Sequence, residues 1–324
     1  MRKTMLRVLS FLSLTALLAA NVFATTQTIG NNMYFSNWGL DRIDQRNLPL
    51  SQSYTYTNTG AGVNVYILDS GINLTHQEFG GRAFHAYDAT LVGGILSGCD
   101  DHGTHVAGII GGANYGVAKG ATLYSVKVST CNGSQPAPVD DDVFIRGLDW
   151  VLLNHVKPAV VNLSLAKHLR CCGSTLPTIT SKTLAIEDRV RALVNNGVTV
   201  VVGAGNEADD VIYFSPARVQ EAITVGGSDW MDQRDANSAY GNVDYYAPGV
   251  FILSASTASS TATAIKTGTS MSTAFVTGVV AKYLQSNPTA TPAQVDQFLF
   301  QTATYNKIPD PFYGINRHLI FTNN

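Results

Sequence analysis

Three side chains in this sequence have types and settings suited to covalent chemistry. Ser270 lies in the tetrad 268–271 (GTSM), and Asp69 and His102 precede it in the chain. A serine hydroxyl is a weak nucleophile at neutral pH, so it needs a base within hydrogen-bonding distance and a third group that orients this base. The three residues together predict a serine hydrolase.

Each of these residues is expected where a regular element ends or begins. Asp69 ends the apolar run 63–68, whose β-branched and aromatic residues indicate a buried strand. His102 and Ser270 begin apolar runs that predict helices, and Gly268 permits a tight turn before the second one. At such a helix start the backbone N–H of Ser270 is unpaired and available to an anion.

Apolar strand-like runs alternate with helical stretches along most of the chain. This pattern favours an α/β fold in which helices cover both faces of a mostly parallel sheet. Ligands bind beyond the carboxyl ends of such strands, so we expect Asp69, Ser164 and Asn206 on one rim. The polar segment 29–60 is expected to lie over the surface. The expected strands are 63–69, 122–128, 159–163, 198–203, 222–225 and 251–255, and the expected helices begin at 102 and 270 or span 143–153, 183–194 and 292–301.

The composition is that of a large globular domain. The 324 residues are 45% hydrophobic and 14% charged, which allows a sizeable core, and we expect one large domain. The formal net charge is −2 and the pI is about 6.4, and no stripe of Lys and Arg is present. These values argue against a nucleic-acid partner.

Residues 1–24 have the pattern of a secretory signal peptide. Three basic residues precede the apolar stretch 9–20, and small or branched residues lead to Ala24, after which we expect cleavage. An uncleaved anchor is the alternative, but the apolar stretch is short for a membrane span. We therefore expect a secreted protein, extracellular or periplasmic, without membrane association after cleavage. In an exported chain, the four cysteines favour disulfides over metal binding.

The chain resembles the subtilisin-like serine proteases, and their proteinase K-like branch in particular, from about Trp38 to its C-terminal region. The matching segments, in chain order, are 38–43 (WGLDRI), 67–72 (ILDSGI), 102–108 (HGTHVAG), 115–118 (YGVA), 162–165 (NLSL), 203–206 (GAGN), 213–219 (YFSPARV) and 268–271 (GTSM). The resemblance implies the three-layer subtilisin-like fold, with a short segment at 25–37 and a peptidase domain at 38–324. It also implies a monomeric endopeptidase that cuts proteins or peptides through an acyl-enzyme and needs no cofactor for catalysis.

The resemblance further implies a role for each matching residue. Ser270 attacks the scissile carbonyl, His102 takes and returns the proton, and Asp69 orients the imidazole. Asn206 and the backbone N–H of Ser270 stabilise the oxyanion. A substrate peptide adds to the cleft as an extra strand, with bulky apolar or aromatic residues preferred before the cut. One side of this cleft is formed by Ser164, Leu165 and Ala166, and the other by Asn132, Gly133 and Ser134. Gly205 is a further substrate-binding residue.

Structural features are implied in the same way. Cys99 and Cys131 match a disulfide of the proteinase K-like branch, and Ser215-Pro216 matches a cis peptide bond. The carbonyls of Gln220 and Ala222 with the carboxylate of Asp244 match a structural Ca²⁺ site, although Asp244 aligns only with a one-residue deletion. An ordinary solvated aspartate is the alternative at that position.

The chain departs from the family pattern at several places. The family has two glycines where Ala166 and Lys167 stand, and alanine there would narrow the cleft floor or strain a backbone that needs positive φ. It also has proline where Ala274 stands. These changes leave open a catalytically impaired homologue that binds extended peptides. An α/β-hydrolase esterase is a third interpretation, but the chain lacks Gly-x-Ser-x-Gly and has a different order of partners.

The segment between the expected signal and the peptidase domain is short. The family has a folding propeptide there, whereas this chain has only residues 25–37. Folds with much non-local parallel pairing form slowly. Unaided folding, a separate folding helper and a truncated sequence all stay open as explanations.

Overall fold

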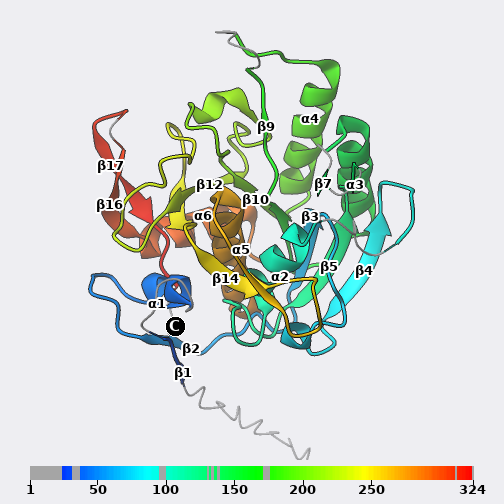
Figure 1. Cartoon of the computed structure of the whole chain (residues 1–324). Helices are drawn as coiled ribbons and strands as arrows, with labels where there is room; N and C mark the ends of the chain where they lie inside the picture. Colours follow the sequence, from blue (N-terminus) through cyan, green and yellow to red (C-terminus); the bar gives the residue numbers. More distant parts are fainter. Residues whose placement is uncertain are drawn as a thin grey trace, which may run out of the picture.

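The computed structural model describes residues 24–30, 37–94, 100–129, 131–132, 135–136, 139–170, 176–310 and 312–322 (Figure 1). Within these ranges, no helix is both long and apolar enough to span a membrane.

A large sheet lies at the centre of the described part of the chain. Its nine strands follow the order β16-β17-β13-β12-β10-β8-β3-β5-β4, and each neighbouring pair is parallel except β16 with β17. The sheet is therefore mostly parallel, as the alternating pattern predicts. Its strands are β3 (Asn64–Asp69), β4 (Ala83–Asp88), β5 (Thr122–Lys127), β8 (Ala159–Leu163), β10 (Thr199–Gly203), β12 (Ile223–Ser228), β13 (Tyr245–Pro248), β16 (Thr304–Asp310) and β17 (Ile315–Leu319).

Helices cover both faces of this sheet. One face is covered by α1 (Trp38–Ile43), α2 (His102–Gly111), α5 (Thr269–Ser286) and α6 (Pro292–Thr302), and the other by α3 (Asp141–Asn154) and α4 (Ser181–Asn195). Successive strand residues point to opposite faces. In β3, Val65 and Ile67 join the first core, whereas Tyr66 and Leu68 join the second. The predicted three-layer α/β fold is confirmed.

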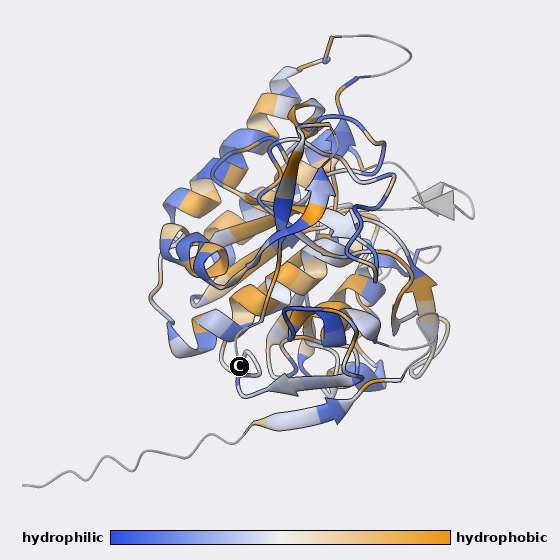
Figure 2. Cartoon of the chain, turned by 90° about the vertical axis from the view of Figure 1, so that its left-hand side faces the viewer, coloured by the Kyte–Doolittle hydropathy of each residue, from blue (hydrophilic) through white to orange (hydrophobic). Residues whose placement is uncertain are grey.

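The distribution of hydropathy agrees with two cores separated by the sheet. Figure 2 shows hydrophobic segments gathered in the central strands and in a helix beside them. The outer helices carry hydrophilic residues on their exposed sides. The helix α5, which carries Ser270, is buried along nearly its whole length. Ser270 is therefore held by an element that is buried in the core.

Short pairs of strands complete the described structure. Residues of β1 and β2, β6 and β7, β9 and β11, and β14 and β15 pair antiparallel outside the large sheet. The elements are β1 (Thr25–Thr28), β2 (Ser53–Tyr56), β6 (Cys131–Asn132), β7 (Gln135–Pro136), β9 (Lys167–His168), β11 (Phe214–Ser215), β14 (Ile252–Ala255), β15 (Thr263–Lys266) and the 3₁₀ turns η1 (Gln77–Phe79) and η2 (Val211–Tyr213).

Two expectations about individual segments are wrong. The run 251–255 was expected to be a strand of the main sheet, but β14 pairs with β15 and packs on α2, where Ser254 Oγ donates to the His105 carbonyl at 2.8 Å. The segment 29–60 does not simply lie over the surface, because Trp38, Ile43 and Tyr54 are buried. Apolar content indicates burial, but it does not say which element covers a residue.

Candidate active site

Three elements bring the candidate catalytic residues to one edge of the sheet. Asp69 ends β3, which lies between β5 and β8, while His102 begins α2 and Ser270 is the second residue of α5. The close approach of α2 to the strand end requires glycine at position 103. A Cβ there would lie 2.4 Å from the Gly71 carbonyl oxygen and 3.1 Å from the Asp69 side chain.

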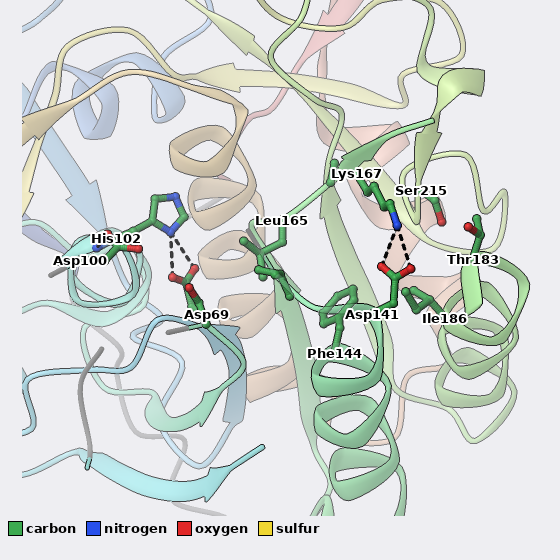
Figure 3. A pocket seen from close by; sticks show the side chains of 13 residues that line it. Asp69, Asp100, His102, Asp141, Phe144, Leu165, Lys167, Thr183, Ile186 and Ser215 are labelled. Carbon is green, nitrogen blue, oxygen red and sulfur yellow. Dashed lines mark hydrogen bonds and ion pairs between the residues drawn. The ribbon is translucent and has the colours of Figure 1, made fainter. Parts of the chain in front are cut away.

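The Asp69 carboxylate and the His102 imidazole form a short, partly buried pair. His102 Nδ1 lies 2.8 Å from Asp69 Oδ1 and 2.9 Å from Oδ2, as Figure 3 shows. The carboxylate is buried, and the imidazole side chain is 23% exposed. Because a carboxylate only accepts hydrogen bonds, we assign the proton to Nδ1. The Nε2 atom is then free to accept a proton.

The charges around His102 determine its proton affinity. Burial lowers the pKa of His102, but the charge of Asp69 and its hydrogen bond to the imidazole raise the pKa by more, so it lies above the usual 6.5. Asp100 also raises it, and Lys266 lowers it. Lys266 is itself paired with Asp101, at 2.6 Å between Nζ and Oδ1. The net result favours an imidazole that accepts a proton readily.

Ser270 is held in a network that the sequence motifs did not predict. Among the described residues, its Oγ donates to the Ser164 carbonyl at 3.0 Å rather than to His102. In return, Ser164 Oγ donates to the Ser270 carbonyl at 2.9 Å and accepts a hydrogen bond from Asn162 Nδ2 at 3.0 Å. Thr277 Oγ1 donates to Asn162 Oδ1 at 2.8 Å. Asn162 and Thr277 thus fix the end of β8 against α5, and only their burial in the folded chain reveals this positioning role.

The side-chain amide of Asn206 has a defined orientation beside Ser270. Asn206 Oδ1 accepts hydrogen bonds from Thr269 N at 2.9 Å and from Thr269 Oγ1 at 3.1 Å. The atom that faces a backbone N–H must be an acceptor, so the amide nitrogen lies at the opposite end. No described residue accepts a hydrogen bond from the Ser270 backbone N–H, as expected near a helix start. Two donors are therefore available beside the Ser270 hydroxyl.

A cavity of about 540 Å³ extends from the Asp69–His102 pair toward α3 and α4. Figure 3 shows Leu165 between this pair and the far end of the cavity. The wall is mostly apolar, which suits the side chain of a bound peptide. The lining residues are Asp69, Asp100, His102, Ser129, Val139, Asp141, Phe144, Leu165, Ala166, Lys167, Thr183, Ile186 and Ser215.

The two departures from the family glycines are accommodated without positive φ. Ala166 lines the cavity, but neither it nor Lys167 is among the described residues with a left-handed backbone. Lys167 belongs to β9 and pairs with Ser215 of β11. The expected strain at Ala166 is therefore absent. The predicted cis peptide bond between Ser215 and Pro216 is confirmed.

The structure describes some of the remaining predicted cleft residues and not others. Gly205 is buried, has a φ of +115° and adjoins Asn206, and a Cβ there would lie 2.4 Å from the Phe214 ring. Asn132 lies in β6, where its backbone pairs with Gln135. Cys131 occupies the same short strand. The expected signal segment up to residue 23 and the residues Cys99, Gly133 and Ser134 lie outside the described residues.

The predicted calcium ligands line one separate cavity, of about 280 Å³. Gln220, Ala222 and Asp244 adjoin it together with Asp296. Asp244 Oδ2 accepts a hydrogen bond from Thr224 N at 2.8 Å, and burial raises the pKa of Asp244 to about 7. In the described part of the chain, no three His, Cys, Asp or Glu residues form a metal-binding group. A cation here would depend on backbone carbonyls as well as on Asp244.

His105 has a structural position. It lies one turn after His102 in α2 and is buried, with Nε2 3.0 Å from the Ile252 carbonyl and 3.1 Å from the Ala264 carbonyl. Burial lowers the pKa of His105 to about 4, so its imidazole is neutral at physiological pH. It connects α2 to the β14–β15 pair.

Comparison with known proteins decides the family. The model described as "Subtilase family" matches residues 60–315, which is most of the chain. The chain belongs to the subtilase family. A relative with 52% identity over 274 residues is the "Extracellular serine proteinase" of Thermus sp. (strain Rt41A), with 84% of this chain and 63% of that protein covered. The "Alkaline serine exoprotease A" of Vibrio alginolyticus is 40% identical over 283 residues, with 87% of this chain and 49% of that protein covered.

A solved subtilase structure has the same fold. The crystal structure of a cold adapted subtilisin-like serine proteinase matches with a TM-score of 0.79 and 39% identity, covering 89% of this chain and 98% of that one. This subtilase chain spans between about half and two thirds of the length of the two curated relatives. The fold and the family are thus shown by sequence and structure independently.

Proposed function

We propose that this subtilase is a serine endopeptidase that hydrolyses peptide bonds through an acyl-enzyme. The observation that carries the proposal is the contact of His102 Nδ1 with both oxygens of the buried Asp69 carboxylate. Asp69 ends β3, which pairs with β8, and Ser270 bonds to the Ser164 carbonyl just after β8. The contact of His102 Nδ1 with Asp69 leaves Nε2 available as the base for Ser270. Family membership and the order Asp69, His102, Ser270 support the same assignment.

The proposed mechanism begins with a rotation of the Ser270 hydroxyl. Its Oγ leaves the Ser164 carbonyl and donates to His102 Nε2, and catalytic hydrogen bonds often tighten in this way only when substrate is bound. Oγ then attacks the scissile carbonyl carbon while His102 takes the proton, and the resulting oxyanion accepts hydrogen bonds from Asn206 Nδ2 and Ser270 N–H. His102 returns the proton to the leaving amine. A water molecule then attacks the acyl-enzyme with His102 again acting as the base, and this step releases the acyl group and restores the Ser270 hydroxyl.

We also propose the cellular location, the disulfide pairing and the substrate preference of this subtilase, from the sequence pattern and from its relatives. The chain is secreted after removal of residues 1–24, as the name of its Thermus relative suggests, and belongs to the proteinase K-like branch. Cys99 and Cys131 form a disulfide, and catalysis needs no cofactor. The apolar cavity beside Leu165 supports a preference for apolar or aromatic substrate residues before the cut.

The pH dependence should report the His102 base. A protonated imidazole cannot accept the Ser270 proton, so kcat/KM falls as the pH drops through the pKa of His102 in the free enzyme. Because the Asp69 charge places this pKa above 6.5, the acid limb of the kcat/KM profile should have its midpoint above pH 6.5. Initial rates on a peptide substrate from pH 5 to 9 measure it. A midpoint below 6.5 would contradict the assigned charge environment.

The side-chain amide of Asn206 should stabilise the transition state more than it stabilises the bound substrate. Asn206→Ala removes one oxyanion donor, and we expect kcat to fall by about 10²- to 10³-fold, the order known for the equivalent loss in subtilisin, with little change in KM. Steady-state kinetics on one peptide substrate test this. Asn195→Ala, the same change at an exposed position at the end of α4, is the matched control. A rise in KM at constant kcat would instead assign Asn206 to substrate binding.

We propose a structural Ca²⁺ site at Gln220, Ala222 and Asp244. Carbonyl and carboxylate oxygens are the hard ligands that Ca²⁺ prefers, and these residues adjoin one cavity. Saturating Ca²⁺ should raise the melting temperature by about 5 °C over a chelator, since a ligand at 100 times its Kd stabilises the native state by about 2.7 kcal/mol. Asp244→Asn should remove this difference. Equal melting temperatures for the unmodified chain in Ca²⁺ and chelator would refute the site.

The second candidate function is peptide binding without efficient turnover. It is favoured by Ala274, which is fully buried in α5 where the family pattern has proline. Incubating the purified chain with a peptide library and analysing it by mass spectrometry separates the two functions. New termini that do not appear with Ser270→Ala support the endopeptidase, whereas retention of intact peptides without new termini supports the impaired homologue.

A further inference from the structure

An ion pair crosses the cavity that begins at the Asp69–His102 pair. Lys167 Nζ in β9 lies 2.8 Å from Oδ2 and 3.0 Å from Oδ1 of Asp141, the first residue of α3. Both residues line the same cavity as His102. Figure 3 shows the pair beyond Leu165, with Phe144 and Ile186 beside it. The two charges therefore adjoin the part of the cavity that lies beyond Leu165 from His102.

The cavity wall around this pair is apolar apart from two hydroxyl residues. Val139, Phe144, Leu165, Ala166 and Ile186 are the apolar lining residues, Thr183 and Ser215 add hydroxyl groups, and the other charged lining residues belong to the catalytic end. The Asp141 side chain is only 15% exposed, whereas Lys167 is 53% exposed. A partly buried carboxylate is costly without a partner, so the ammonium of Lys167 keeps this part of the cavity close to neutral.

A second ion pair at the same helix start provides a comparison. Asp142, the next residue of α3, pairs with Lys182 of α4 at 2.6 Å. Asp142 and Lys182 are about half exposed and do not line the cavity. Exposed pairs of this kind contribute little energy and are screened by salt. Both ion pairs thus join a lysine to an aspartate at the start of α3. Only the Asp141–Lys167 pair lines the cavity.

We propose that the Asp141–Lys167 pair is a specificity-determining element of this subtilase, and the inference rests on the proposed endopeptidase function. While the pair is intact, this end of the cavity is close to neutral and accepts apolar side chains of peptide substrates over charged ones. Either partner alone would leave a charge facing the cavity. Lys167 without Asp141 recruits substrates with Asp or Glu at that position, and Asp141 without Lys167 recruits substrates with Lys or Arg.

The test is a specificity profile of five proteins on peptide libraries that vary each position before the cut. They are the unmodified chain, Asp141→Asn, Lys167→Gln and the matched controls Asp142→Asn and Lys182→Gln. At one position, Asp141→Asn should raise kcat/KM for Glu relative to Leu by about tenfold, as a gain of about 1.4 kcal/mol implies. Lys167→Gln should do the same for Lys. The controls should stay within about twofold of the unmodified chain, and 0.5 M NaCl should reduce both gains.

Several outcomes would overturn the proposal. Unaltered profiles in Asp141→Asn and Lys167→Gln, or equal changes in the two controls, show that the pair does not face the bound side chain. The double variant Asp141→Asn with Lys167→Gln covers the case in which a single variant folds poorly, because it should regain the apolar preference. Absence of cleavage by the unmodified chain contradicts the endopeptidase function itself, and this inference with it.

Discussion

His102→Ala should lower kcat by about 10⁶-fold, the order known for the same change in subtilisin. The reason is that the Ser270 hydroxyl then has no base, and the carbonyl of Ser164, its acceptor in the structure, cannot take a proton. Substrate affinity should change little, because the alanine removes no contact that binds the peptide backbone. Single-turnover and steady-state kinetics on one peptide substrate measure both parameters.

A matched control separates catalysis from folding. His85→Ala removes an exposed imidazole on β4 and should leave kcat unchanged. The melting temperature of His102→Ala should stay within a few degrees of that of the unmodified chain, since the imidazole is partly exposed. Retention of more than about one thousandth of the activity in folded His102→Ala would rule out His102 as the general base, given the size of this effect in the family.

Asp69→Asn should lower kcat by about 10⁴-fold while the chain stays folded. An asparagine can present its NH₂ group to Nδ1, which stabilises the wrong tautomer of His102, and it no longer balances the imidazolium that forms in the transition state. Removing the Asp69 charge also removes the main influence that raises the pKa of His102. The acid limb of the remaining activity should therefore move to lower pH.

Two comparisons make the Asp69 prediction specific. Asp188→Asn changes an exposed aspartate of α4 and should have no effect on kcat. Because Asp69 acts through His102, the double variant Asp69→Asn with His102→Ala should be no slower than His102→Ala alone. Additive losses, or an acid limb that stays in place in Asp69→Asn, would contradict the proposed role of the carboxylate.

The sequence predicts those parts of the fold that depend on local patterns. The strand 159–163 and the helix that begins at Pro292 agree with β8 and α6, because apolar runs and a Thr-Pro helix start are local signals. The edge strand β16 was missed, since its residues lack alternation and include Pro309, which is tolerated only at a sheet edge. The run 251–255 was assigned to the wrong sheet because strand pairing is a tertiary property.

In the candidate site, too, local patterns predict some residues, and tertiary contacts determine the others. Motifs and chain order are sufficient to propose Asp69, His102, Ser270 and Asn206, because each follows a strand or begins a helix. The positioning network through Asn162 and Thr277 joins residues 115 apart in the chain, and nothing local in the sequence links them. Likewise, Asp141 and Lys167 come from different elements. Only the folded chain shows that both adjoin one cavity.

The most direct test of the proposed function is labelling by a fluorophosphonate probe, which reacts with an activated serine. Purified chain is incubated with the probe, digested with trypsin and analysed by mass spectrometry, with Ser270→Ala and heat-denatured chain as controls. The proposed mechanism predicts one labelled peptide that contains Ser270, and no label in either control. Label that persists in Ser270→Ala, or that is found on another serine, would contradict Ser270 as the nucleophile.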